Sequence, residues 1–206
     1  MVKKQSKSGK GWSLERVLPY LYLIGGSLAV ISAAILTSDK IELLKNPHAH
    51  LNCNLNPIVA CGSVIAKPQA EAFGFPNPYL GLAGFAAVAT IGVAILAGGK
   101  FKRWFWLLVE AGVVFAVGFV TWLQFQSIFR INALCPYCMV VWTVTVPIFW
   151  YTTLYNLRTG TIRTPDKLRG FVAFIQRHHA DILILYYLTL AAVILHHFWY
   201  YWKTVI

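Results

Sequence analysis

Two cysteine pairs are the residues of this chain whose types and spacing are best suited to chemistry. Cys135 and Cys138 enclose Pro-Tyr in the segment ALCPYCMVVW, at the front of a long apolar run. Cys53 and Cys61 lie upstream, at the two ends of CNLNPIVAC. Four cysteines allow three disulfide pairings, and the sequence does not choose among them.

The spacing of Cys135 and Cys138 favours a redox dithiol. A proline directly after Cys135 suits the first turn of a helix, where its missing N–H costs nothing. The unpaired N–H groups and the dipole at a helix N-terminus stabilise an anion, here a thiolate. Cys-x-x-Cys pairs in such positions have thiol pKa values below that of a free cysteine.

The pair Cys53 and Cys61 lies in a stretch rich in asparagine and proline, for which we predict turns and flexibility. A flexible pair outside the membrane is suited to thiol–disulfide exchange between a soluble partner and a fixed pair at the membrane. Two alternatives stay open, namely inert structural disulfides and a zinc site that includes His48 and His50. The seven residues between Cys53 and Cys61 exceed the two to four that usually separate structural zinc ligands.

The composition indicates a membrane protein. The 206 residues are 58% hydrophobic and 12% charged, whereas a soluble domain has roughly 25% charged residues. Five segments reach the length of about 20 apolar residues that spans a bilayer, and they are residues 18–37, 79–98, 104–127, 136–156 and 182–202. We therefore predict an all-α, polytopic membrane protein in a lipid bilayer, since helices satisfy their own backbone groups there. The first segment is longer than the core of a signal peptide, so we expect it to remain as an anchor.

The positive charge is concentrated on one side of the predicted bundle. Thirteen of the 18 Lys and Arg residues fall in the N-terminal tail, the 99–103 turn and the 157–181 loop. This distribution is the positive-inside pattern, which predicts a cytoplasmic N-terminus in a cell membrane and all four cysteines on the extracytoplasmic side. Topology thus accounts for the net charge of +11 without a nucleic-acid partner, and disulfide chemistry is permitted on the cysteine side.

The expected organisation has four parts. Residues 1–17 form a basic cytoplasmic tail, and residues 18–156 form a four-helix catalytic core whose extracytoplasmic loop is 38–78. Residues 157–181 form a basic cytoplasmic loop, and residues 182–206 carry the fifth transmembrane helix. Within the third predicted span, Glu110 is a carboxylate inside the membrane. Such a group is a functional candidate, a protonated and hydrogen-bonded residue, or a residue that snorkels to the nearby cytoplasmic face.

Several segments, taken in order, resemble the vitamin K epoxide reductase family in its bacterial disulfide-forming branch. They are the loop cysteine pair, the segment CGSVIAKPQAEAFGFPNPYLGL (61–82), and WLQFQSIFRINALCPYCMVVW (122–142). The resemblance covers roughly residues 17–156. Many bacterial relatives continue into a fused thioredoxin-like domain, whereas this chain stops at Ile206. We therefore expect its thioredoxin-like redox partner to be a separate extracytoplasmic protein.

The resemblance implies a four-helix bundle around a membrane quinone, either menaquinone or ubiquinone. It implies that Cys138 faces the quinone, that Cys135 exchanges with Cys61, and that Cys53 meets the partner protein. It also implies that Asn77 hydrogen-bonds a quinone carbonyl.

Two positions depart from the family pattern. Lys67 stands where relatives commonly carry serine, and Trp142 stands where animal members carry a tyrosine that contacts the quinone. An indole N–H donates a hydrogen bond but accepts none, and both changes bear on the type of quinone and on any epoxide chemistry. We expect Trp142 and Phe115 to be walls of the quinone pocket.

These expectations together describe a quinone-dependent thiol oxidoreductase. It would re-oxidise the thioredoxin-like partner and pass the electrons through both cysteine pairs to the quinone, which supports disulfide bond formation. One alternative is a quinone-epoxide reductase that uses the same cysteines. The other is a non-catalytic membrane scaffold with structural disulfides or zinc.

Overall fold

The protein is helical throughout the residues that its computed structural model describes, which are 14–47, 49 and 51–205. No strand forms within these residues, where β-pairing is limited to two isolated bridges. The elements in chain order are α1 (Leu14–Lys45), α2 (Cys61–Ile65), the 3-10 helix η1 (Pro68–Glu71), α3 (Pro78–Leu96), α4 (Arg103–Phe125), the π-helix η2 (Gln126–Ile131), α5 (Pro136–Arg158), the 3-10 helix η3 (Asp166–Leu168), α6 (Arg169–Arg177), α7 (His179–His197) and α8 (Trp199–Val205). The predicted all-α fold is confirmed.

Five helical segments of the described chain are long and apolar enough to cross a membrane, as predicted. They are Leu14–Lys45, Pro78–Leu96, Arg103–Ile131, Pro136–Arg158 and His179–His197. The first helix does not end at residue 37. It continues to Lys45 because no glycine or proline interrupts the sequence between Gly26 and Pro47.

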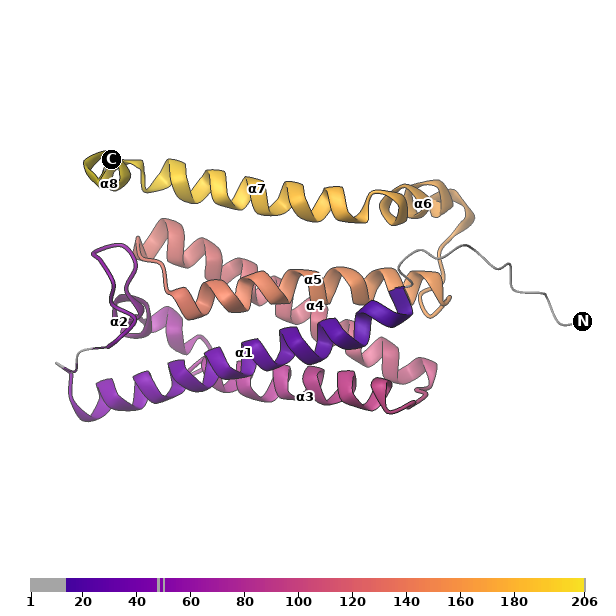
Figure 1. Cartoon of the computed structure of the whole chain (residues 1–206), viewed down its shortest axis with the longest axis horizontal. Coiled ribbons are helices and arrows are strands. Elements are labelled where there is room, and N and C mark those ends of the chain that lie inside the picture. Colours follow the sequence, from indigo (N-terminus) through magenta and orange to yellow (C-terminus); the bar gives the residue numbers. More distant parts are fainter. Residues whose placement is uncertain (1–13, 48, 50, 206) are drawn as a thin grey trace, which may run out of the picture.

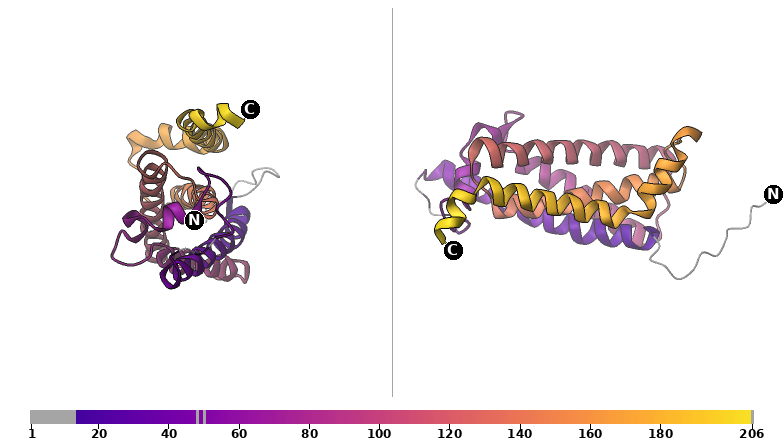
Figure 2. Two further views of the ribbon diagram at one scale, coloured as in Figure 1. Left: turned by 90° about the vertical axis from the view of Figure 1, so that its left-hand side faces the viewer. Right: turned by 90° about the horizontal axis from the view of Figure 1, so that it is seen from above.

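Four of these helices form a bundle, and the fifth runs along its outside. In the bundle α1 packs against α3 and α5, and α4 packs against α5. Figure 1 shows α7 lying beside this bundle, and the end-on view in Figure 2 shows it outside the other four helices. Glycines allow α1 and α3 to approach closely, since a Cβ atom on Gly92 would lie 2.7 Å from the backbone nitrogen of Leu23.

The chain connections place the cysteines and the basic loops at opposite ends of the bundle. The segment from the end of α1 to the start of α3, which includes α2, lies at the same end as the start of α5 (Figure 1). The α3–α4 turn and the connection from α5 to α6 lie at the other end. The bundle therefore brings both cysteine pairs to one end, although more than 70 residues separate the pairs along the chain.

A polar network crosses the apolar bundle near the end with the basic loops. The Tyr22 and Thr152 hydroxyls are 2.6 Å apart and join α1 to α5. Thr153 donates a hydrogen bond of 2.6 Å to one oxygen of Glu110, and the Asn156 amide donates one of 2.8 Å to the other. The intramembrane carboxylate is thus held by hydrogen bonds between α4 and α5, which offsets the cost of placing it in a bundle within lipid.

Candidate redox site

The first turn of α5 holds the Cys-x-x-Cys motif in the arrangement predicted from its proline. Cys135 is the N-cap residue, with extended backbone angles, and Pro136 opens the helix. The backbone N–H of Cys138 donates a hydrogen bond of 3.4 Å to the Cys135 sulfur. The sulfur of Cys135 therefore accepts a hydrogen bond from one of the N–H groups that have no partner within the helix.

The upstream cysteines, Cys53 and Cys61, form a disulfide with each other. Two asparagine side chains build the turns around it. Asn54 Oδ1 accepts a hydrogen bond from the Gly62 N–H, and Asn56 Oδ1 accepts from two successive backbone N–H groups beyond it. The turns agree with the sequence, yet the disulfide is buried, since Cys53 is 5% exposed and Cys61 is 0% exposed.

The two cysteine pairs are in direct contact. The sulfur of Cys135 lies 3.4 Å from the sulfur of Cys61. Backbone pairing next to them fixes this approach, because Ala60 N–H donates to the Leu134 carbonyl at 2.9 Å and Leu134 N–H donates to the Ile58 carbonyl at 2.7 Å. The loop is thus held in register beside the residue that precedes Cys135, and a sulfur of one pair lies where it can attack the other pair.

The surroundings of Cys135 favour its thiolate. The pKa of Cys135 is lowered from its ordinary value, first because the Cys138 side chain donates a hydrogen bond to its sulfur. The backbone N–H groups of Cys138 and Tyr137 lower it further, whereas burial opposes these effects. Because the thiolate is the nucleophile in disulfide exchange, Cys135 is the activated member of its pair.

A large apolar cavity lies within the bundle next to the second cysteine of the motif. Its volume is about 620 Å³, and its walls come mainly from α3, α4 and α5. Cys138, Asn77, Trp142 and Phe115 all line it. Of the four cysteines, each of which lies in the described part of the chain, Cys138 is the one on the cavity wall.

The polar groups on the cavity wall differ in whether their hydrogen bonds are satisfied. The Asn77 amide accepts a hydrogen bond from the Ala72 N–H at 3.0 Å and donates one to the Gln69 carbonyl at 2.7 Å, so it is engaged within the loop. The side-chain oxygen of Gln69 is buried and has no hydrogen-bond partner. Sequence reasoning missed Gln69, because its only signal was its place in the segment 61–82 that resembles the family loop.

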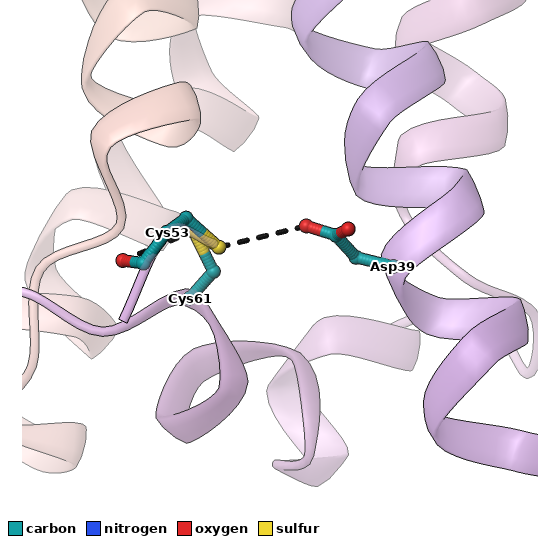
Figure 3. Close-up of side chains that lie close together, drawn as sticks. All are labelled: Asp39, Cys53 and Cys61. Atoms are coloured by element: carbon teal, nitrogen blue, oxygen red, sulfur yellow. Dashed lines mark hydrogen bonds between the residues drawn. A yellow bond between two sulfur atoms is a disulfide. The ribbon is translucent and has the colours of Figure 1, made fainter. Parts of the chain in front are cut away.

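A carboxylate that sequence reasoning also missed lies beside the disulfide. Figure 3 shows Asp39, on α1, directed at the sulfur of Cys53, and the distance from its Oδ2 is 3.5 Å. The donor atoms of Asp39, Cys53 and Cys61 lie within 4.8 Å of one another. Zinc binds cysteine as the thiolate, and the two sulfurs of a disulfide carry no such charge. The histidines of the zinc alternative, His48 and His50, lie outside the described residues.

Five helices able to span a membrane, with two touching cysteine pairs above an apolar cavity, define a helical membrane protein built for redox chemistry. The vitamin K epoxide reductase family matches this chain over residues 20–153, and the chain belongs to that family. The match contains most of the four-helix bundle, both cysteine pairs and the whole cavity wall, and it ends before α7. No curated protein matches the chain. Family membership supports an oxidoreductase activity in the membrane.

Proposed function

We propose that this protein is a thiol–disulfide oxidoreductase that takes electrons from a thioredoxin-like extracytoplasmic partner and passes them to a membrane quinone. One observation carries the proposal. The sulfur of Cys135 is 3.4 Å from the Cys53–Cys61 disulfide, and Cys138, which completes its pair, lines the apolar cavity. The cysteines thus connect a loop at the end of the bundle with a cavity inside it.

The proposed electron path has four exchange steps, one of which is closure of the partner's own disulfide. A thiolate of the partner attacks the sulfur of Cys53, which requires the loop to move because Cys53 is 5% exposed, and Cys61 leaves as a thiolate. Cys61 then attacks Cys135 in the oxidised Cys135–Cys138 pair, so that a Cys61–Cys135 disulfide forms and Cys138 is released. When the partner has closed its own disulfide and freed Cys53, Cys53 attacks Cys61 and releases Cys135. The two electrons of the partner now reside in the Cys135–Cys138 dithiol.

The pairing of the four cysteines is the one expected at the end of this path. Cys53 and Cys61 are joined, while Cys135 and Cys138 are free thiols. From this state the dithiol returns to a disulfide by giving up two electrons and two protons. A quinone supplies the matching chemistry when bound, since it accepts two electrons and two protons to become a quinol.

The cavity suits a quinone ring. Ligand pockets have volumes of about 300–1,000 Å³ and mostly apolar walls with a few polar groups, and this cavity of about 620 Å³ is of that kind. We assign Trp142 and Phe115 to its walls, and Gln69 and Asn77 to its polar contacts. The unpaired side-chain oxygen of Gln69 suits a quinol hydroxyl, whereas Asn77 has to exchange one of its bonds within the loop to reach a quinone carbonyl.

The redox energetics favour a quinone as acceptor. A strongly oxidising thioredoxin-like protein has a reduction potential of roughly −120 mV, so its re-oxidation requires an acceptor that is more oxidising still. The glutathione pool is more reducing than that. A quinone dissolved in the bilayer meets the requirement and reaches the cavity from the lipid.

The proposed orientation places the cysteines outside the cytoplasm of a cell membrane. The support is the distribution of charge, because the Lys and Arg residues of the 99–103 turn and the 157–181 loop lie at the end of the bundle opposite to the cysteines. The positive-inside rule assigns that end to the cytoplasm.

The test is reduction of menaquinone and ubiquinone analogues by the purified protein, driven by dithiothreitol and followed by quinone absorbance. We expect turnover in the unaltered protein and none in Cys138→Ala, with Lys203→Ala at an exposed position near the end of the chain as the matched control. Equal turnover in Cys138→Ala would refute the assignment of the quinone-facing thiol. Absence of turnover with every quinone, in protein that retains its unfolding transition, would support the scaffold alternative.

A further inference from the structure

The carboxylate of Asp39 is positioned to exchange a proton with Cys53. Its Oδ2 lies 3.5 Å from the Cys53 sulfur, which is within reach of an S–H donor. Figure 3 shows the carboxylate approaching the disulfide from α1, opposite the loop that holds both cysteines. Cys53 is 5% exposed, so a proton on its sulfur has little access to bulk water.

The charged and titratable groups around Asp39 leave it available for this exchange. On α1, Lys40 pairs with Glu71 of η1 at 2.8 Å and donates to the Ile65 carbonyl, so this cation is engaged elsewhere. Among the described residues, the groups that face Asp39 from the loop and from α2 are Cys53 and Cys61. Cys135, at the start of α5, interacts electrostatically with the charge of Asp39. No ion pair to Asp39 occurs among residues 14–47, 49 and 51–205.

We propose that Asp39 is the general base for the step that closes the Cys53–Cys61 disulfide. The thiolate that the departing partner leaves on Cys53 first takes up a proton, and in this step the resulting Cys53 thiol attacks Cys61 in the Cys61–Cys135 disulfide. The Cys53–Cys61 bond forms, the Cys61–Cys135 bond breaks, and its electron pair goes to Cys135, which leaves as a thiolate. The proton of Cys53 passes to Asp39. One carboxylate and one thiol are consumed, and one carboxylic acid and one thiolate are produced, so atoms and charge balance.

The described arrangement is that of the products of this step. The new disulfide is in place, the leaving sulfur of Cys135 is still 3.4 Å from Cys61, and hydrogen bonds from Cys138 and Tyr137 favour its thiolate form. Asp39 and Cys135 therefore act at opposite ends of one displacement. One removes a proton from the attacking sulfur, and the other accepts the electron pair of the departing bond.

This inference rests on the proposed cysteine path, but its test needs no quinone. The full chain is prepared as the Cys138→Ser variant, in which one disulfide is shared between the Cys53–Cys61 and Cys61–Cys135 positions. A jump in pH shifts this distribution. Acid quenching, alkylation of free thiols and peptide mass spectrometry then give the rate at which the two forms interconvert.

We expect an interconversion rate that is nearly constant between about pH 6 and pH 8, because the Asp39 carboxylate takes the proton from the thiol. Burial raises the pKa of Asp39 from its ordinary value, so the rate should fall only on the acid side of this range. In Asp39→Asn the attacking thiol must ionise by itself, and its ordinary pKa is about 8.5. The interconversion rate of Asp39→Asn should therefore rise about tenfold per pH unit. At pH 6 it should be at least about tenfold lower than the rate of the protein that retains Asp39. Asp39→Glu, which keeps a carboxylate, should restore the flat profile.

Glu42→Gln is the matched control, because Glu42 is an exposed carboxylate on the same end of α1. It should leave both the rate and the profile unchanged. A flat profile in Asp39→Asn, or a tenfold rise per pH unit in the protein that retains Asp39, would overturn the proposal. A tenfold rise in the protein that retains Asp39 would refute the role of Asp39 even if Asp39→Asn does not fold. Failure of quinone reduction with a normal interconversion profile would refute the proposed function and leave the role of Asp39 standing.

Discussion

The close contact of α1 with α3 gives a prediction whose size follows from the geometry. A Cβ atom at Gly92 would lie 2.7 Å from the Leu23 nitrogen, 2.8 Å from the Pro19 oxygen and 3.0 Å from the Tyr22 Cβ. Ordinary carbon contacts are about 3.5–4.0 Å, and two of these three neighbours are backbone atoms. Gly92→Ala therefore forces the helices apart by several tenths of an ångström, instead of being absorbed by a side-chain rotation.

The expected cost is that of an overpacked core, about 1–3 kcal/mol, reduced by up to about 1 kcal/mol because alanine is the better helix former. With the full gain in helix propensity, the free energy of unfolding should fall by up to about 2 kcal/mol. In a chain of this size each 1 kcal/mol corresponds to roughly 2–4 °C in the unfolding midpoint. Thermal unfolding of the purified protein in detergent measures this shift.

Gly84→Ala is the matched control, because Gly84 is on the same helix and an added Cβ there meets no atom within 4 Å. It should leave the midpoint unchanged or raise it slightly through helix propensity alone. Equal destabilisation by the two substitutions would refute the reasoning, since the loss could not then be assigned to the α1–α3 contact.

Three further predictions concern the cysteines and the cavity. Cys53→Ala should abolish electron transfer from a thioredoxin-like protein but preserve quinone reduction driven by dithiothreitol, and equal loss with both reductants in the quinone assay would contradict the assigned order. Cys138→Ala removes the first hydrogen bond that lowers the pKa of Cys135. The thiolate absorbance of Cys135 should then titrate at higher pH. The stability that its thiolate contributes is present above the unfolded-state pKa and is lost as the pH falls through the folded-state pKa, so in the variant it should be smaller and its loss should be complete at a higher pH. Gln69→Leu removes the unpaired acceptor and should raise the KM for quinone roughly two- to tenfold without changing the rate of the Cys61–Cys135 exchange, and an unchanged KM would remove Gln69 from the pocket.

The parts of the fold that depend on local sequence could be predicted. Hydropathy over about 20 residues located all five spanning helices, because each spanning helix must be apolar along its own length to lie in lipid. Pro136 located the start of α5, since its preference for the first turn is a property of the residue itself. The end of α1 was missed because its last turns lie beyond the apolar run, where hydropathy no longer indicates the helix.

The parts of the site that depend on long-range packing could not be predicted from residue patterns. Asp39 reaches Cys53 from a different element, and the buried oxygen of Gln69 is recognised only when the cavity is present. The burial of Cys53 was also hidden, because the asparagines around it indicate turns but do not say what those turns cover. Such contacts depend on how the loop folds onto the bundle, and short motifs carry no information about that.

The position of the dithiol at the end of a spanning helix explains how one motif can serve two environments. Cys135 is the last residue before α5, so its sulfur stays with the loop and contacts Cys61. Cys138 is one turn further on, inside the helix, and its side chain is part of the cavity wall. The hydrogen bond from the Cys138 N–H to the Cys135 sulfur keeps the two within one turn. A longer spacing would separate the sulfurs beyond disulfide reach, and a motif deeper in the helix would remove Cys135 from the loop. In the proposed function, the helix start is therefore the position at which a single dithiol can exchange with a protein disulfide on one side and with a ligand in the apolar cavity on the other.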